Sequence, residues 1–268
     1  MPGAIGVFDS GVGGLTVLGE LLRHIPSGDF LYFGDTARLP YGSKSPQTVA
    51  RYAVSSAHFL ERHGAEMLVV ACNTATALAL PEIQKSVAIP VIGVVGPGAD
   101  AAAAASRSHK AVVIGTEATI SSHAYQRALA SRGLEACEKP CPLLVPLVEE
   151  GWTDHPVTEQ VARIYLTEAF ANGSHAADVL LLGCTHYPLL KPLLRRITPE
   201  RVTIVDSAES TAAAVQLALG GSGSKLENRN SRLRFFATDS VEKFKRLGSL
   251  FLGRPLDDVT HVDIDSPL

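Results

Sequence analysis

The chain has 268 residues, of which 46% are hydrophobic and 19% charged, and its formal charge is −3 at pH 7. This composition is typical of a compact globular protein with one large or two smaller domains, and it excludes disordered and fibrous classes. The small negative charge offers no field that attracts a phosphate backbone, so we expect no nucleic-acid partner. No apolar run approaches the roughly 20 residues of a membrane span, so we expect no membrane partner.

The first residues run directly into a strand-like segment and lack the basic region, apolar stretch and cleavage site of a secretory signal. We therefore expect a cytoplasmic protein. Its four cysteines, Cys72, Cys137, Cys141 and Cys184, are then expected to be reduced thiols rather than a disulfide framework.

Strand-like and helix-like segments alternate along the first third of the chain. Apolar runs predict strands at 4–8, 30–33, 67–71 and 90–95, and helical periodicity predicts helices from Leu15, over 47–63 and from about Thr74. We expect Pro81 to shorten or kink the third helix. The triplet Gly96-Pro97-Gly98 is interpreted as the first domain boundary.

The rest of the chain repeats this rhythm. Strands are predicted at 111–114, 179–182 and 202–205, and helices at about 99–106, 119–132, 158–172 and 207–219. Residues 220–224 are predicted to be flexible, and a last strand, helix and strand occupy 233–264. Strands alternating with helices indicate an α/β fold with parallel sheets and outer helices. The repetition points to an old duplication with two similar lobes, although the sequence leaves open which sheet the last strands join.

Two stretches of the chain, 69–76 and 181–188, echo each other. Each is an apolar run that ends in a cysteine, Cys72 or Cys184, followed by polar residues and a predicted helix. In a parallel sheet the carboxyl ends of the strands share one edge, where helix N-termini offer free N–H groups. The polar residues expected at such strand ends, and hence in the candidate site, are Asp9-Ser10, Cys72-Asn73-Thr74, Thr116, Glu149 and Cys184-Thr185-His186.

Two thiols that face one substrate suit stereochemical inversion at a C–H centre. One thiolate removes the proton, and the other thiol returns a proton to the opposite face. Asp9 could adjust the proton affinity of Cys72, while His186 and Glu149 could do so for Cys184.

These residues closely resemble the glutamate racemase family, the cofactor-independent members of the aspartate/glutamate racemase superfamily. The resemblance covers roughly residues 4 to 219 and rests on six motifs in the family's order and spacing. They are Phe8-Asp9-Ser10-Gly11-Val12-Gly13-Gly14-Leu15, Tyr32-Phe33-Gly34-Asp35, Pro40-Tyr41-Gly42, Ala71-Cys72-Asn73-Thr74-Ala75, Pro146-Leu147-Val148-Glu149 and Gly183-Cys184-Thr185-His186-Tyr187-Pro188.

The resemblance implies a glutamate racemase that needs no cofactor or metal and supplies D-glutamate for peptidoglycan synthesis. It implies two lobes, 1–96 and 97–206, with 207–268 returning to the first, and a homodimer. The catalytic residues would be Cys72 and Cys184, with Asp9 beside the first and Glu149 and His186 beside the second. The substrate would be held by Asp9, Ser10, Tyr41, Gly42, Asn73, Thr74, Thr185 and His186 in the cleft between the lobes.

Other interpretations remain open at this point. A racemase for aspartate or another amino acid would use the same motifs. The glycines Gly11-Val12-Gly13-Gly14 after a strand also invite a dinucleotide-binding interpretation, but Thr16 stands where that fingerprint needs a small residue. A non-catalytic amino-acid-binding protein would not need paired cysteines. Cys137 and Cys141 have half of a metal-site spacing without a second Cys/His pair, so we interpret them as structural.

Overall fold

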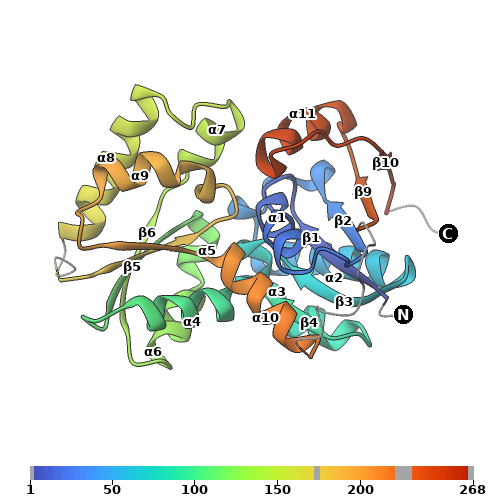
Figure 1. Ribbon diagram of the computed structural model, residues 1–268, viewed down its shortest axis with the longest axis horizontal. Helices are drawn as coiled ribbons and strands as arrows, with labels where there is room; N and C mark the ends of the chain where they lie inside the picture. Colours follow the sequence, from blue (N-terminus) through green and yellow to red (C-terminus); the bar gives the residue numbers. More distant parts are fainter. Residues whose placement is uncertain (1–2, 172–175, 221–230, 265–268) are drawn as a thin grey trace.

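Two parallel β-sheets, each flanked by helices, form the computed structural model, which describes residues 3–171, 176–220 and 231–264 (Figure 1). The predicted α/β class is confirmed. Among the described residues no helix is both long and apolar enough to cross a membrane.

The larger sheet has six strands in the order β10-β9-β2-β1-β3-β4, all paired in parallel. Their bounds are β1 (Ala4–Asp9), β2 (Phe30–Gly34), β3 (Ala65–Val70), β4 (Val91–Gly93), β9 (Leu233–Ala237) and β10 (Val259–His261). The two strands left unassigned by the sequence thus extend this sheet beside β2. Its central strands are apolar on both faces, as expected for a parallel sheet covered by helices on each side.

The smaller sheet has four parallel strands in the order β6-β5-β7-β8. Their bounds are β5 (Lys110–Gly115), β6 (Glu135–Pro140), β7 (Val179–Gly183) and β8 (Thr203–Asp206). Most side chains of the edge strand β6 are only half-buried, and its sequence contains no apolar run. For this reason the sequence analysis did not predict a strand there.

Eleven α-helices and three 3₁₀ helices connect the described strands. The α-helices are α1 (Leu15–His24), α2 (Pro46–Arg62), α3 (Asn73–Ser86), α4 (Val95–Ala105), α5 (Glu117–Ser121), α6 (Ala124–Ala130), α7 (Leu144–Glu149), α8 (Pro156–Ala171), α9 (Lys191–Ile197), α10 (Ser207–Ala218) and α11 (Val241–Leu252). The 3₁₀ helices are η1 (Thr36–Arg38), η2 (Tyr41–Ser43) and η3 (Tyr187–Leu190). The helix predicted over 47–63 matches α2, and Gly64 follows it with a φ of +93°.

Three helix boundaries differ from the predictions. Helix α3 continues through Pro81 to Ser86, because its buried side packs on α2 and offsets the lost backbone hydrogen bond. The triplet Gly96-Pro97-Gly98 lies in the first turn of α4, where proline is tolerated. The predicted helix 119–132 is divided into α5 and α6 by His123, whose φ is +52°.

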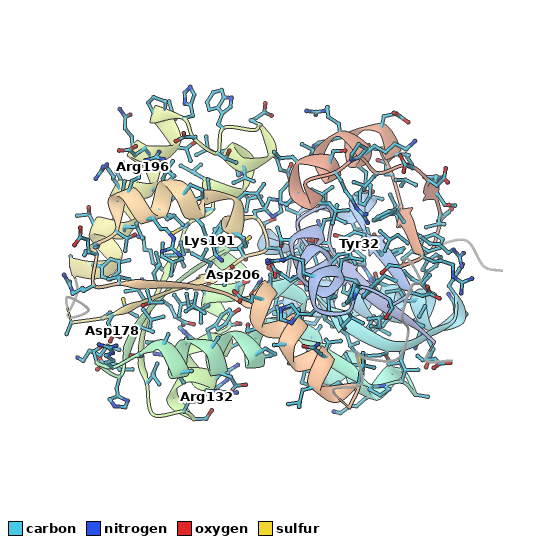
Figure 2. All side chains as sticks on the ribbon, in the orientation of Figure 1. Tyr32, Arg132, Asp178, Lys191, Arg196 and Asp206 are labelled. Carbon is cyan, nitrogen blue, oxygen red and sulfur yellow. The ribbon has the colours of Figure 1, made fainter. Side chains whose placement is uncertain are left out.

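Helix α10 packs against α1 beside the larger sheet and against α4 beside the smaller one. Asp206, the last residue of β8, caps this helix by accepting a hydrogen bond from the backbone N–H of Ala208 at 2.8 Å. The same carboxylate forms an ion pair with Lys191, and the two side chains lie near the middle of the molecule (Figure 2). Of the stretch predicted to be flexible, residues 221–224 lie outside the described residues.

Candidate active site

Strands of both sheets deliver residues to one cavity of about 450 Å³. The turns after β1 and β3 reach it from the larger sheet, and those after β5 and β7 reach it from the smaller sheet. Of the residues predicted for the site, only Asp9 does not line this cavity. Those that line it are Ser10, Tyr41, Gly42, Cys72, Asn73, Thr74, Thr116, Glu149, Cys184, Thr185 and His186.

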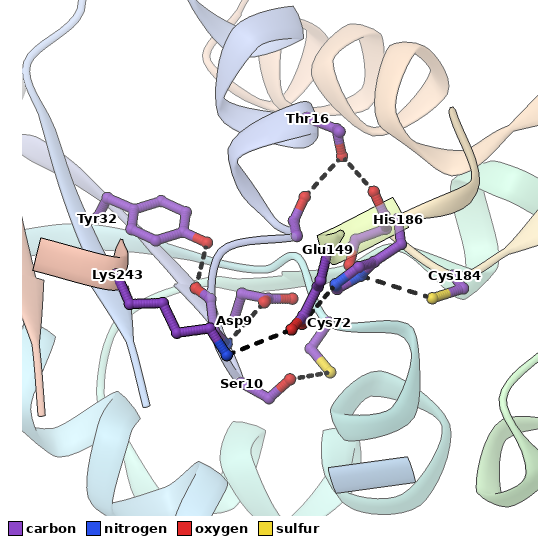
Figure 3. A network of polar contacts seen from close by, with 12 residues as sticks. Asp9, Ser10, Thr16, Tyr32, Cys72, Glu149, Cys184, His186 and Lys243 are labelled. Carbon is purple, nitrogen blue, oxygen red and sulfur yellow. Dashed lines mark hydrogen bonds and ion pairs between the residues drawn. The ribbon is translucent and has the colours of Figure 1, made fainter. Parts of the chain in front are cut away.

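Cys72 follows β3 and occupies the N-cap of α3, where its Sγ accepts a hydrogen bond from the backbone N–H of Ala75 at 3.4 Å. The thiol itself donates to the hydroxyl of Ser10 at 3.7 Å (Figure 3). Burial, and next the charge of nearby Asp9, raise the pKa of Cys72 to about 12. At neutral pH and without ligand, Cys72 therefore carries its proton.

Asp9 ends β1 and lies beneath the glycine-rich turn, with 1% of its surface exposed. Its Oδ2 accepts a hydrogen bond from the N–H of Gly11 at 2.8 Å. Burial raises the pKa of Asp9, while the N–H groups of this turn and the charge of His186 act in the opposite direction. Asp9 therefore lies behind the wall of the cavity. It acts on the site through its charge and does not line the cavity.

Cys184 lies at the start of a chain of three side chains (Figure 3). Nδ1 of His186 is 3.9 Å from the Sγ of Cys184, and Nε2 is 3.2 Å from Oε1 of Glu149. Burial lowers the pKa of His186, but the hydrogen bonds to Cys184 and Glu149 outweigh it and raise that pKa to about 10. The hydrogen bond from His186 lowers the pKa of Glu149. At neutral pH, Cys184 therefore faces an imidazolium that is paired with a carboxylate.

Asn73 and Thr74 begin α3 beside Cys72. Asn73 accepts a hydrogen bond from the hydroxyl of Tyr125 at 2.6 Å, whereas its buried Nδ2 has no hydrogen-bond partner among the described residues. The hydroxyl of Thr74 is 3.0 Å from that of Thr116 and 3.1 Å from that of Thr119, which come from the other side of the cavity. An unpaired amide donor at a helix N-terminus is suited to bind a carboxylate.

Tyr41 and Gly42 form part of the short helix η2 at the cavity wall. The hydroxyl of Tyr41 donates to Oδ2 of the buried Asp35 at 2.6 Å, so it supports the loop. A Cβ at Gly42 would lie 3.0 Å from the Cβ of Thr116, so this glycine allows the loop to approach α5 closely.

The glycine-rich turn is in tight contact with the turn that follows Cys184. A Cβ at Gly13 would lie 2.2 Å from Oγ1 of Thr185 and 2.6 Å from Nδ1 of His186. Thr16, one turn later, donates to the backbone oxygen of Thr185 at 3.1 Å (Figure 3). These glycines therefore permit contact between two turns of the protein, which explains the motif without a dinucleotide.

Glu149 was expected directly after a strand, but it is the last residue of helix α7. The preceding strand β6 ends at Pro140, and α7 carries the carboxylate back toward η3. The segment 143–148 has too few residues to distinguish a short buried helix from a strand by periodicity.

Several lining residues were not predicted from the sequence. Glu117 follows β5 directly after Thr116, and only Thr116 of these two was predicted. Lys243 belongs to α11, 55 residues after the last recognised motif, which ends at Pro188, and no local pattern distinguishes it from other surface lysines. The remaining ones are Leu39, Pro40, Ser43, Pro142, Val145 and Pro146.

Cys137 and Cys141 are free thiols that donate to the backbone oxygens of Ala169 and Lys139. Cys72 and Cys184 are also free. In the part of the chain that the structure describes, no group of three or more His, Cys, Asp or Glu side chains could hold a metal ion.

Comparisons with known proteins agree with this geometry. The model of the Asp/Glu/Hydantoin racemase family matches residues 16–218. The glutamate racemase of Koribacter versatilis is 58% identical over 97% of each chain. The crystal structure of glutamate racemase isoform RacE1 from Bacillus anthracis has a TM-score of 0.90 at 40% identity, with 97% of each chain covered. That of glutamate racemase from Francisella tularensis in complex with D-glutamate has a TM-score of 0.89 at 35% identity, with 98% of each chain covered. The chain therefore belongs to the Asp/Glu/Hydantoin racemase family, within its group of glutamate racemases, and is an amino-acid racemase.

Proposed function

We propose that the chain interconverts L- and D-glutamate by a two-thiol, two-base transfer of the Cα proton, without a cofactor. The observation that carries this proposal is that Cys72 and Cys184, delivered by strands of different sheets, line the same cavity. Glutamate as substrate is supported by the relatives and by the Francisella tularensis enzyme, whose crystal structure contains D-glutamate.

In the proposed reaction the two thiols have different surroundings before substrate binds. Sγ of Cys184 lies 3.9 Å from Nδ1 of the His186 imidazolium, whereas burial and the charge of Asp9 keep Cys72 protonated. The thiolate of Cys184 removes the proton from Cα of one enantiomer, and the S–H bond of Cys72 breaks as its proton is delivered to the opposite face. The product leaves Cys184 as the thiol and Cys72 as the thiolate, which is the arrangement that the opposite enantiomer needs.

The carbanion and the two carboxylates of glutamate require hydrogen-bond donors. We propose that Nδ2 of Asn73, the hydroxyls of Thr74 and Thr185, and backbone N–H groups near Gly42 supply them. Ser10 and the loop of Tyr41 would hold the ammonium side of the substrate, and the charge of the buried Asp9 would favour it from behind the cavity wall. Donors fixed before the reaction stabilise developing charge at little reorganisation cost.

We further propose the biological setting that the family resemblance implies. The enzyme would act in the cytoplasm as a homodimer and supply D-glutamate for peptidoglycan synthesis. Residues 1–96 and 207–268 would form one lobe and residues 97–206 the other, with the substrate between them.

The experiment that tests this function uses the purified full chain with no added cofactor. L-Glutamate, D-glutamate and both enantiomers of aspartate are incubated separately, and chirality is followed by chiral chromatography. We expect both glutamate enantiomers to approach the racemic mixture and aspartate to react much more slowly. Cys72→Ala and Cys184→Ala should each abolish racemisation. Faster turnover of aspartate, or full activity in either variant, would refute the proposal.

A further inference from the structure

Helix α11 lies after the last recognised motif, yet it packs over the Cys184 side of the cavity. It follows β9 on the larger sheet and faces α7 at the top of Figure 1. Its buried side includes Phe244, Leu247 and Phe251. The helix is therefore fixed to the larger sheet, whereas α7 and its Glu149 belong to the part of the chain around the smaller sheet.

Two side chains of α11 contact the chain of Glu149, His186 and Cys184. Nζ of Lys243 is 3.7 Å from Oε2 of Glu149, and this oxygen is the one that His186 leaves free (Figure 3). About two helical turns after Lys243, the buried ring of Phe251 contacts the ring of His186 edge-on, with 5.0 Å between centroids and 78° between planes. Glu149 is thus held between an imidazolium and an ammonium that come from different parts of the fold.

We propose that Lys243 is a positioning residue for the racemase reaction, which acts through Glu149 on His186 and thereby on Cys184. The inference deepens the proposed function and rests on it. Lys243 holds the carboxylate in its ionised form and in reach of Nε2, so that His186 keeps the proton that faces Cys184. Cys72 does not take part in the contact between Lys243 and Glu149. Lys243 therefore acts on Cys184 and not on Cys72.

Several charged or titratable groups surround Glu149, His186 and Cys184, and their effects on pKa can be stated one by one. Glu149 has its pKa lowered by His186 first, and then by Lys243. His186 interacts with the charge of Asp9, at the end of β1, as well as with Cys184 and Glu149. Cys141 and Tyr187 adjoin Cys184, but burial raises the pKa of both, so they stay neutral near pH 7. Of the charged groups named here, Lys243 can be substituted while both thiols and His186 stay unchanged.

Removing the ammonium should raise the pKa of Glu149. On acidification, Glu149 would then become protonated at a higher pH than in the wild type. His186 would lose its negative partner at that higher pH. The acid limb of kcat/KM against pH is therefore expected to move upward. The side chain of Lys243 is 56% exposed and that of Glu149 23%, so the shift should be that of a partly solvated pair, about 0.2–0.7 pH units.

The test compares Lys243→Met, which removes the charge, with Lys243→Arg, which keeps it. Lys245→Met is the matched control, because Lys245 lies on the same helix, pairs with Glu242 at 3.6 Å and does not line the cavity. The pH dependence of kcat/KM and of KM is measured for both glutamate enantiomers, at low salt and at 1 M salt. We expect the acid limb to move only in Lys243→Met, with KM above the limb unchanged. In 1 M salt, where screening acts over about 3 Å, wild type should move toward the variant.

Three results separate the possibilities. Coincident acid limbs for Lys243→Met and wild type would overturn the inference while leaving the racemase function intact. A higher KM with unmoved limbs would overturn it too, since Lys243 would then bind substrate instead of positioning Glu149. A folded wild-type protein without racemase activity would refute the proposed function itself, and this inference with it.

Discussion

The turn between β1 and α1 passes so close to the Thr185–His186 turn that Gly13 has no room for a side chain. We expect Gly13→Ala to damage catalysis more than a typical alanine substitution does. The added Cβ would lie 2.2 Å from Oγ1 of Thr185, and 2.6 and 2.7 Å from Nδ1 and Cε1 of His186. Restoring ordinary contact at 3.4 Å requires the two turns to separate by about 1.2 Å.

The neighbours of Gly13 cannot move freely. Thr185 and His186 are both buried, and His186 is held on its other side by Glu149 and by the ring of Phe251. Overpacking of this kind costs about 1–3 kcal/mol of unfolding free energy. A displacement of about 1 Å in a catalytic group can lower kcat on the order of 100-fold. The expected signature is a loss of kcat of this size together with a moderate loss of stability.

The assay measures racemisation in both directions and the free energy of unfolding in urea for Gly13→Ala and for Gly96→Ala. Gly96 is the control, because a Cβ there meets nothing within 4 Å and the residue lies in helix α4. Alanine at a helical position is favoured by up to about 1 kcal/mol over glycine, so this control should keep its activity and its stability. Wild-type kcat and stability in Gly13→Ala would refute the steric reasoning.

The remaining predictions concern single groups around the cavity. Tyr41→Phe removes the donor to buried Asp35 and should lower the free energy of unfolding in urea by about 1–3 kcal/mol, whereas an unchanged value would mean that this hydrogen bond stabilises nothing. Because the pKa of His186 is raised from 6.5 to about 10, its stabilising contribution is fully present below pH 6.5 and is lost as the pH rises through 10. The decline in unfolding free energy between pH 7 and 10 should therefore be smaller in His186→Asn, and an equally steep decline would contradict the assignment. Asn73→Ala should raise KM for glutamate about 10- to 100-fold, since a hydrogen bond to a charged group is worth about 1.5–3 kcal/mol, and an unchanged KM would exclude Asn73 from binding.

The parts of the fold that follow from local pattern could be predicted from the sequence. The central strands β1, β3, β5 and β7 each contain a continuous apolar run, and the residue types after these runs mark the turns that meet at the cavity. The pairing of Cys72 with Cys184 could be inferred because both stand at the same place in this pattern. The alternative of a dinucleotide-binding turn is excluded in favour of the racemase family, whose model matches residues 16–218.

Long-range packing could not be predicted in the same way. The order of the strands depends on contacts between distant segments, so the place of β9 and β10 beside β2 has no local signal. The break at His123 reflects a single left-handed residue in an otherwise helical pattern. Lys243 reaches the cavity because α11 folds back over it, and its sequence neighbours are ordinary for an exposed helix face.

The central claim is that two different thiols act on opposite faces of Cα, and deuterium uptake tests it most directly. Wild-type enzyme is incubated in D₂O with L-glutamate or D-glutamate, and each reaction is stopped at low conversion. Enantiomers are then separated and their Cα–H content is measured by NMR. The account predicts that the product carries solvent deuterium at Cα while the unreacted enantiomer keeps its original hydrogen. Equal deuterium in both enantiomers, or transfer of the original hydrogen to the product, would indicate a single base and contradict the account.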